Sequence, residues 1–182
     1  MFSLTKIHKL CLGALFIALC TALPQLFHLV GLGSPFSPMH IPVILCGLVC
    51  GGLYGGICGI IGPVISSLSF SMPDTASLIP MIPELMLYGL VSGLLAQYLP
   101  IQNTAAKTYA SMLPAMLLGR IAAGVTRYFL FVGQGKGYVI SMWLTSHFVK
   151  SFPGIILQLI LIPALILVLK KSGILKAKQP TK

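Results

Sequence analysis

The stretch that decides the fold is residues 10–73, LCLGALFIAL CTALPQLFHL VGLGSPFSPM HIPVILCGLV CGGLYGGICG IIGPVISSLS FSMP, which contains no Asp, Glu, Lys or Arg. The whole chain has 182 residues, of which 57% are hydrophobic and 8% are charged. A membrane-spanning helix needs about 20 mainly apolar residues. Length and composition therefore predict an integral membrane protein with no room for a soluble catalytic domain.

The N-terminus resembles a signal peptide only superficially. Lys6 and Lys9 precede the first apolar run, but this run continues past Pro24 without a persuasive small-residue cleavage site. We interpret it as a retained first helix.

Apolar runs and the breakers between them predict six helical spans, at residues 8–30, 40–54, 56–72, 79–98, 108–132 and 141–169. The second and third share a short stretch, in which four glycines mark the turn: Gly51, Gly52, Gly55 and Gly56. We expect an all-α integral membrane protein in which residues 1–182 form a single transmembrane domain.

Basic residues at both ends of the chain predict the topology. Loops and flanks rich in lysine stay in the cytoplasm, so both termini are expected there, which requires an even number of spans. The flanking lysines are Lys6, Lys9, Lys170, Lys171, Lys176, Lys178 and Lys182. They hold most of the net charge of +10. We interpret this charge as a topology signal with attraction to anionic lipid, not as a nucleic-acid interface.

Four ionisable side chains fall inside the apolar stretches: Glu84, Arg120, Arg127 and Lys150. Such groups cost several kcal/mol each at membrane depth unless they are paired or face water, so they indicate a functional site. Three are cationic, which favours a solute that carries negative charge. The alternative is that Glu84 pairs with a cation only to hold helices together, while Arg127 extends to the outer interface.

Helical spacing aligns these groups with other polar side chains. Glu84 and Tyr88 lie one turn apart, and Arg120 and Arg127 share a face about 10 Å apart along the axis. The sixth span carries a stripe at spacings of three and four, Trp143, His147, Lys150, Ser151, Gly154 and Gln158. We expect spans four to six to face one another around a wet cavity that is reached from outside.

The first outer loop, residues 31–39, is rich in glycine and proline and also holds the apolar Phe36. It is either a lid over an outward-facing pocket or an ordinary connection. His40 follows it at the start of the second span. This histidine either contacts a ligand or caps the helix, and the sequence leaves both open.

Enzyme and metal chemistry are not expected. Cys46 and Cys50 lie one helical turn apart, but no matching cluster of ligands accompanies them, so we expect packing and not metal binding. The Gly-x-x-x-x-Gly-Lys and His-Glu-x-x-His motifs are absent. An intramembrane enzyme using Glu84 with His147 and a scaffold whose polar groups only pair helices are the competing hypotheses.

Small residues recur every four positions in the first span, at Ala14, Ala18 and Ala22. Such a stripe lets another helix approach closely. That helix belongs either to this chain or to a partner.

These features together resemble the substrate-binding S components of energy-coupling-factor (ECF) vitamin transporters. The resemblance runs from about residue 8 to residue 170, and no one motif in it is diagnostic. It rests on the alanines of the first span, the Pro-rich outer loop and Pro-Met-His-Ile-Pro-Val at 38–43. Further matching stretches are 51–62, Pro83-Glu84-Leu85 with Tyr88-Gly89-Leu90, and Phe-Pro-Gly-Ile-Ile-Leu-Gln at 152–158.

The resemblance implies a multi-pass protein of the cell membrane that captures a vitamin or precursor from outside. It implies a lid formed by the first outer loop and a pocket built mainly by spans four to six. The partners it implies are a transmembrane T component, docked on Ala14, Ala18 and Ala22, and two ATPase subunits. ATP is then used by the partners, with no cofactor in this chain.

The Met-His-Ile-Pro entrance to the second span is most similar to the pantothenate type. A carboxylate substrate also agrees with a pocket rich in Arg and Lys. Cobalamin-precursor, pyridoxine and other vitamin specificities stay open, as does a neutral substrate if Glu84 neutralises a pocket cation.

Overall fold

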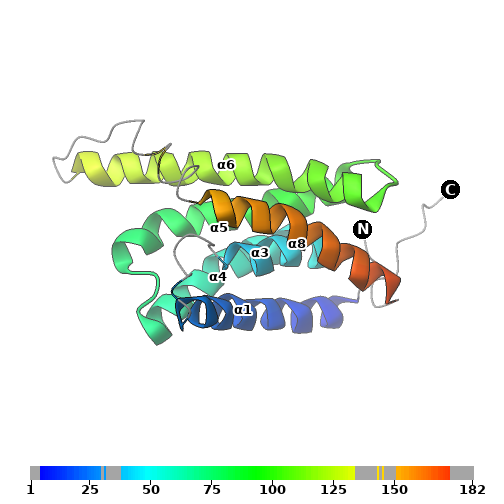
Figure 1. The fold of residues 1–182 in the computed structure, drawn as a ribbon, viewed down its shortest axis with the longest axis horizontal. Helices are drawn as coiled ribbons and strands as arrows, with labels where there is room; N and C mark the ends of the chain where they lie inside the picture. Colours follow the sequence, from blue (N-terminus) through cyan, green and yellow to red (C-terminus); the bar gives the residue numbers. More distant parts are fainter. Residues whose placement is uncertain are drawn as a thin grey trace.

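The computed structural model describes residues 5–29, 31, 38–133, 143, 145 and 151–172, and the described part is a helical bundle (Figure 1). Its helices of eight or more residues are, in chain order, α1 (Lys6–Leu29), α3 (His40–Cys50), α4 (Gly52–Phe70), α5 (Thr75–Tyr98), α6 (Thr104–Gly133) and α8 (Phe152–Lys171). Five of these, all except α3, are long and apolar enough to cross a membrane. The all-α integral membrane fold is confirmed.

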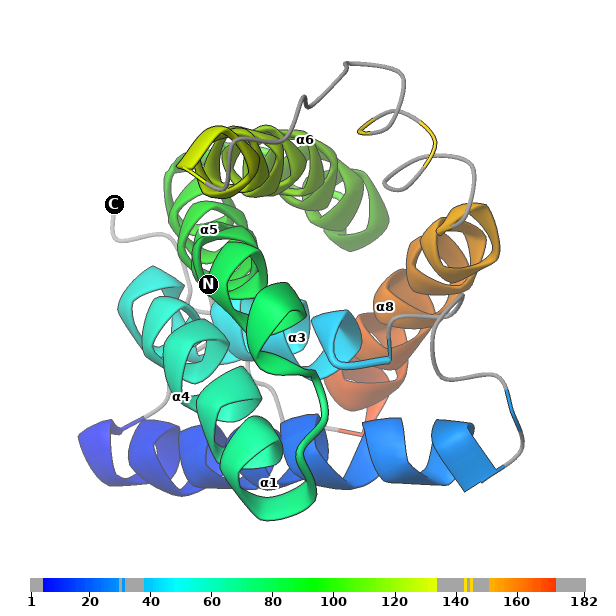
Figure 2. The ribbon, with the colours of Figure 1, turned by 90° about the vertical axis from the view of Figure 1, so that its left-hand side faces the viewer.

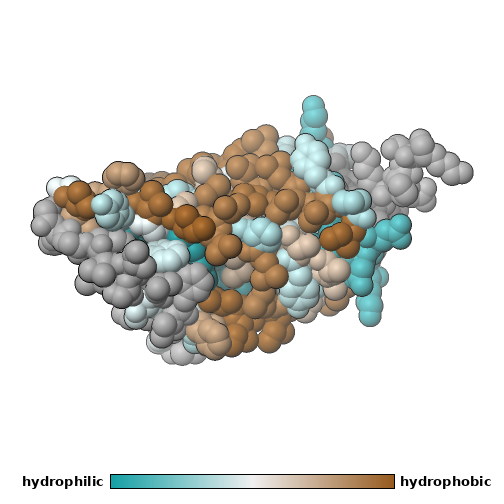
Figure 3. All heavy atoms as spheres, turned by 90° about the horizontal axis from the view of Figure 1, so that it is seen from above, coloured by the Kyte–Doolittle hydropathy of each residue, from teal (hydrophilic) through white to brown (hydrophobic). Residues whose placement is uncertain are grey.

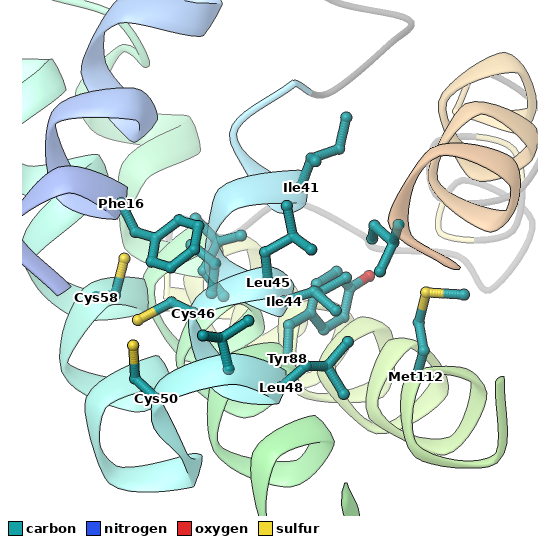
Figure 4. Packing of buried hydrophobic residues seen from close by; sticks show 14 of the residues in the cluster. Phe16, Ile41, Ile44, Leu45, Cys46, Leu48, Cys50, Cys58, Tyr88 and Met112 are labelled. Atoms are coloured by element: carbon teal, nitrogen blue, oxygen red, sulfur yellow. The ribbon is translucent and has the colours of Figure 1, made fainter. Parts of the chain in front are cut away.

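Helix α3 differs from the expected second span. It has 11 residues, which is about 16 Å of helix and shorter than the roughly 30 Å hydrocarbon core. All of its residues are buried. Figure 4 shows Phe16, Cys46 and Cys58 on one side of α3, and Tyr88 and Met112 on the other. The short helix is therefore the centre of the bundle.

The turn between α3 and α4 is a single glycine. Gly51 has a φ of 110°, a backbone conformation that favours glycine, and α4 begins at the next residue. The expected boundary at residues 55–56 was too late. Gly55 and Gly56 are buried inside α4, where their lack of a side chain serves packing and not turning.

Glycines bring α3, α4 and α5 unusually close together. A Cβ atom built on Gly89 of α5 would fall on the backbone of Gly55 in α4, and one built on Gly55 would fall on Gly47 of α3 and on Gly89. One turn away, a Cβ on Gly59 would meet the backbone of Leu85. Side chains are excluded at these points, so the backbones themselves form the contact.

The other helices pack around this centre. Helix α1 runs beside α4, where the Cys20 and Cys58 sulfur atoms lie 3.9 Å apart. Helix α8 packs against α6 and α3. The hydroxyl of Tyr109 in α6 donates to the carbonyl oxygen of Leu159 in α8 at 3.0 Å. Figure 2 shows α1 and α4 on one side of α3, with α6 and α8 on the other.

The start of α1 and the end of α8, which are the first and last of these helices, lie at the same end of the bundle. The Lys9 ammonium lies 6.0 Å from the ring centroid of Tyr54, near the start of α4. The Lys170 ammonium donates to the Thr104 hydroxyl at the start of α6, at 2.6 Å. This arrangement agrees with an even number of passes. Which end faces the cytoplasm stays a prediction from the lysines.

Apolar side chains cover the middle of the molecule (Figure 3). Leu68, Leu117, Phe129 and Ile160 are more than half exposed, although each is large and hydrophobic. In water such a surface would drive aggregation, whereas lipid tails solvate it. The exposed apolar belt is the surface expected of a protein that lies in a bilayer.

The glycine contacts predict a sharp cost for a branched side chain. Gly89→Val should lower the melting temperature in detergent markedly, because overpacking a tight contact costs about 1–3 kcal/mol even where side chains can yield, and here the opposing atoms are backbone. The control is Gly133→Ala in α6, where an added Cβ meets nothing within 4 Å. Equal melting temperatures for the two variants would show that the close contact is not required.

Candidate functional site

Four polar side chains meet between α3, α5 and α6. The Tyr88 hydroxyl donates to Glu84 Oε1 at 3.0 Å and accepts from Arg120 Nε at 3.1 Å. His40 Nε2 lies 3.6 Å from the same Glu84 oxygen. All four residues are buried, and Tyr88 is 0% exposed. We refer to His40, Glu84, Tyr88 and Arg120 as the polar network.

Local sequence explains how the network is assembled. Glu84 and Tyr88 are one turn apart on α5, so their side chains lie on the same face. Gly119 of α6 leaves room for the Tyr88 ring, since a Cβ there would overlap the ring and approach the Glu84 carbonyl oxygen at 2.7 Å. His40 is the first residue of α3, and its ring centroid lies 5.1 Å from that of Tyr88.

The network holds two opposite charges that do not touch directly in these contacts. The formal charges of Glu84 and Arg120 are opposite, and the Tyr88 hydroxyl connects the two side chains. A charge moved into an apolar interior loses several kcal/mol of hydration, which hydrogen bonds and an opposite charge offset. These are not the only contacts that His40, Glu84 and Arg120 make. The network therefore gives each of these buried polar groups a partner inside the bundle.

Trp143 adds a contact that the sequence did not predict. Its indole N–H donates to the Arg120 carbonyl oxygen at 3.1 Å. Gly124, one turn further along α6, allows this approach because a Cβ there would overlap the indole. Trp143 belongs to the polar stripe of the expected sixth span. The signal for its role is the pairing of this lone tryptophan with Gly124 on α6, which cannot be recognised before the two segments are placed together.

Arg127 lies apart from the network. It is half-buried and two turns beyond Arg120 on α6. Within the described ranges it makes no hydrogen bond or ion pair, so its charge has no protein partner there. The remaining predicted pocket residues, Phe36, His147 and Lys150, lie outside the described residues.

The alanine stripe of α1 lies on the face of the helix that points away from the bundle. Ala14, Ala18 and Ala22 are all exposed, whereas Phe16 and Cys20 of the same helix are buried in the core. The alternative that these alanines pack inside the bundle does not agree with their exposure. The stripe is a free surface of this chain.

The cysteines gather away from the polar network. Cys46, Cys50 and Cys58 lie near one another between α3 and α4 (Figure 4), and Cys20 approaches from α1. In the part of the chain that the structure describes, no group of three or more His, Cys, Asp or Glu residues is placed to hold a metal ion. The thiols there contribute to the apolar core.

One further buried polar group stands out. Gln158 of α8 is 1% exposed, and its side-chain oxygen accepts no hydrogen bond from any described residue. It lies in the predicted polar stripe, but no sequence pattern distinguishes it from the other members of that stripe.

The arrangement suits binding better than catalysis. The described site holds one carboxylate, one guanidinium, a phenol and an imidazole. The carboxylate and the guanidinium are both linked to the same tyrosine. Such a network holds both hydrogen-bond donors and acceptors, which a polar ligand could use.

The chain matches the model of a known protein family. The model of a family described as "ECF transporter, substrate-specific component" matches residues 8–166. Neither the curated proteins nor the solved structures give a significant match to the chain.

The network predicts unequal effects for two Tyr→Phe substitutions. Tyr88→Phe removes the hydroxyl that bridges Glu84 and Arg120, and should destabilise the protein by about 1–3 kcal/mol, because both groups lose a buried partner. Tyr109→Phe removes only the bond to the Leu159 carbonyl from an exposed side chain and should cost less. Thermal unfolding in detergent compares them, and an equal or larger effect of Tyr109→Phe would contradict a structural role for the bridge.

Proposed function

Since the chain belongs to the substrate-specific component family of ECF transporters, we propose that it is the high-affinity binding subunit of an ATP-driven importer for a water-soluble vitamin or vitamin precursor. The family is one of transporter components and not of enzymes. The observation that supports a binding role most directly is the polar network, whose ionisable groups are buried among helices that are mostly apolar enough to cross a membrane.

The charges favour a substrate with a carboxylate. Glu84 is matched by Arg120 through Tyr88. Arg127 has no counter-ion among the described residues, and Lys150 adds a further cation from the sequence. A buried or half-buried cation gains most from a charged, hydrogen-bonding partner. Pantothenate, which carries a carboxylate, is our first choice, and other vitamin specificities are the outcomes to compare it with.

The proposed pocket opens on the outer side of the membrane. With both termini in the cytoplasm, His40 and the start of α5 lie toward the outer end, and His40 directly follows the first outer loop in the sequence. In this proposal residues 31–39, including Phe36, cover the bound substrate, and His147 and Lys150 complete the pocket. His40 supports this arrangement, because it joins the polar network directly after that loop.

The proposed partners are a transmembrane T component and two ATPase subunits, which supply the ATP hydrolysis. The exposed stripe Ala14, Ala18 and Ala22 supports docking of the T component on α1, because small residues allow a partner helix to approach closely. The stripe and the polar network lie on opposite sides of α3, so substrate capture and docking use different surfaces.

A thermal-shift screen against water-soluble vitamins tests the function. A ligand at 100 times its Kd stabilises a protein by about 2.7 kcal/mol, which is readily detected. We expect one vitamin to raise the melting temperature, and pantothenate is the first compound to try. A scaffold whose polar groups only pair helices would respond to none.

Arg127 tests the charge of the substrate. Arg127→Met should weaken binding of an anionic vitamin at least tenfold, a loss of about 1.4 kcal/mol. The ligand-free melting temperature should stay unchanged, because Arg127 has no described protein partner. Lys107→Met, at the opposite end of α6, is the control and should leave affinity unchanged. If affinity is the same in both variants, Arg127 serves only the membrane interface.

The alanine stripe separates capture from transport. Ala18→Trp should block the approach of the T component, so that uptake collapses and the four-subunit complex does not co-purify. The isolated variant should still bind the vitamin with near-normal affinity, since Ala18 is exposed. Leu117→Trp places the same large side chain on the exposed face of α6 and should leave the complex intact. Loss of vitamin binding in Ala18→Trp would instead indicate that the stripe supports the bundle.

A further inference from the structure

Gln158 is an exception in its helix. Residues 155–169 read IILQLILIPALILVL, and Gln158 is the only polar residue among them. It does not face lipid. It lies on the buried face of α8 with Gly154, Ile162 and Ile166, whereas Ile160 and Val168 are exposed.

The amide oxygen of Gln158 lacks the local partner that other buried polar side chains have. Ser92, Thr108 and Ser111 donate to carbonyl oxygens of their own helices, three or four residues back. Gln158 Oε1 is buried and accepts nothing from the described residues. A buried acceptor left unsatisfied loses its hydrogen bonds to water without gaining others, so it needs an explanation.

Gln158 also lies closer than Arg120 to the end of the bundle where α6 begins and α8 ends. Tyr109 of α6 donates to the carbonyl of Leu159, the residue that follows Gln158. Lys170 of α8 contacts Thr104 of α6; Gln158 lies 12 residues before Lys170 and Arg120 lies 16 residues after Thr104, about 18 and about 24 Å along the two helix axes. Thr104 and Lys170 mark the end of the bundle toward which Gln158 is displaced from Arg120.

We propose that Gln158 is a substrate-recognition residue whose Oε1 accepts a hydrogen bond from an uncharged hydroxyl or N–H group of the substrate. This inference rests on the proposed function and deepens it. The substrate is then an elongated polar molecule whose charged group stays near Arg120 and Arg127. The uncharged hydroxyl or N–H group of the substrate then lies closer than its charged group to the end of the bundle where α6 begins. A site that hydrogen-bonds a substrate donor rejects analogues without that donor, because the protein group is left unpaired.

The test compares two Gln→Leu variants. Gln158→Leu keeps a side chain of similar size and removes the acceptor. With pantothenate, or with the vitamin that stabilises the wild type most in the screen, isothermal titration should show affinity at least tenfold weaker. The ligand-free melting temperature should be unchanged or higher, because no internal hydrogen bond is lost. Gln25→Leu in α1, where the amide nitrogen is also buried without a partner, should leave affinity unchanged.

Two results would overturn the inference while leaving the proposed function in place. One is equal affinity of the wild type and Gln158→Leu for a vitamin that binds. The other is a lowered ligand-free melting temperature for Gln158→Leu, which would show that the amide serves the fold. If no vitamin binds the wild type, the proposed function fails and this inference fails with it.

The donor group of the substrate can be identified with methylated analogues. Capping the correct hydroxyl or N–H should weaken binding to the wild type at least tenfold but change little in Gln158→Leu, because the two changes remove the same hydrogen bond. Additive losses for every capped group would overturn the assignment.

Discussion

The backbone contact between α4 and α5 is the constraint on which the rest of the structure depends. Leu85, Gly89 and Gly93 recur every four residues on α5, and added side chains at the two glycines would overlap α4 or α3. Glu84, Tyr88 and Ser92 each precede a member of that stripe by one residue, which is about 100° around a helix. Because the contact at Leu85, Gly89 and Gly93 fixes the rotation of α5 about its axis, it also directs Glu84 and Tyr88 toward α3 and α6. The packing contact between α4 and α5 therefore also determines where the polar network lies.

Hydropathy predicted the helices because lipid requires apolar surfaces and internally bonded backbones, and both requirements are visible in a sequence. It did not predict that residues 40–50 would form a short, fully buried helix, because an apolar run is the same whether it faces lipid or protein. The glycines show the same ambiguity. Gly51 does turn the chain, whereas Gly52, Gly55 and Gly56 lie within α4, and sequence alone does not separate a turn from a close contact.

The candidate site was predicted in its parts and not in its connections. Spacing placed Glu84 and Tyr88 on one face, and the cost of buried charge selected Arg120. That a tyrosine joins the two could not be read from the chain, because it depends on how closely α6 approaches α5 at Gly119. The charges alone suggested a surplus of cations around one acid. In the structure Arg120 is joined to Glu84 through Tyr88, whereas Arg127 lies apart, two turns further along α6.

Helix α3 lies between the two surfaces that the proposed transport cycle would use. At its start, His40 contacts Glu84 of the polar network. The preceding residue, Met39, accepts a weak hydrogen bond from the Cys20 thiol of α1 at 3.9 Å. Cys20 lies between Ala18 and Ala22 in the sequence of α1, on the opposite, buried face. A substrate that shifted His40 would therefore move the residue next to Met39, and Met39 contacts Cys20 of α1, the helix that carries the alanine stripe. If the two sites are coupled, bound substrate changes the affinity for the T component, and the bound T component changes the affinity for substrate by the same factor. The short, buried α3 is the element whose position both surfaces share.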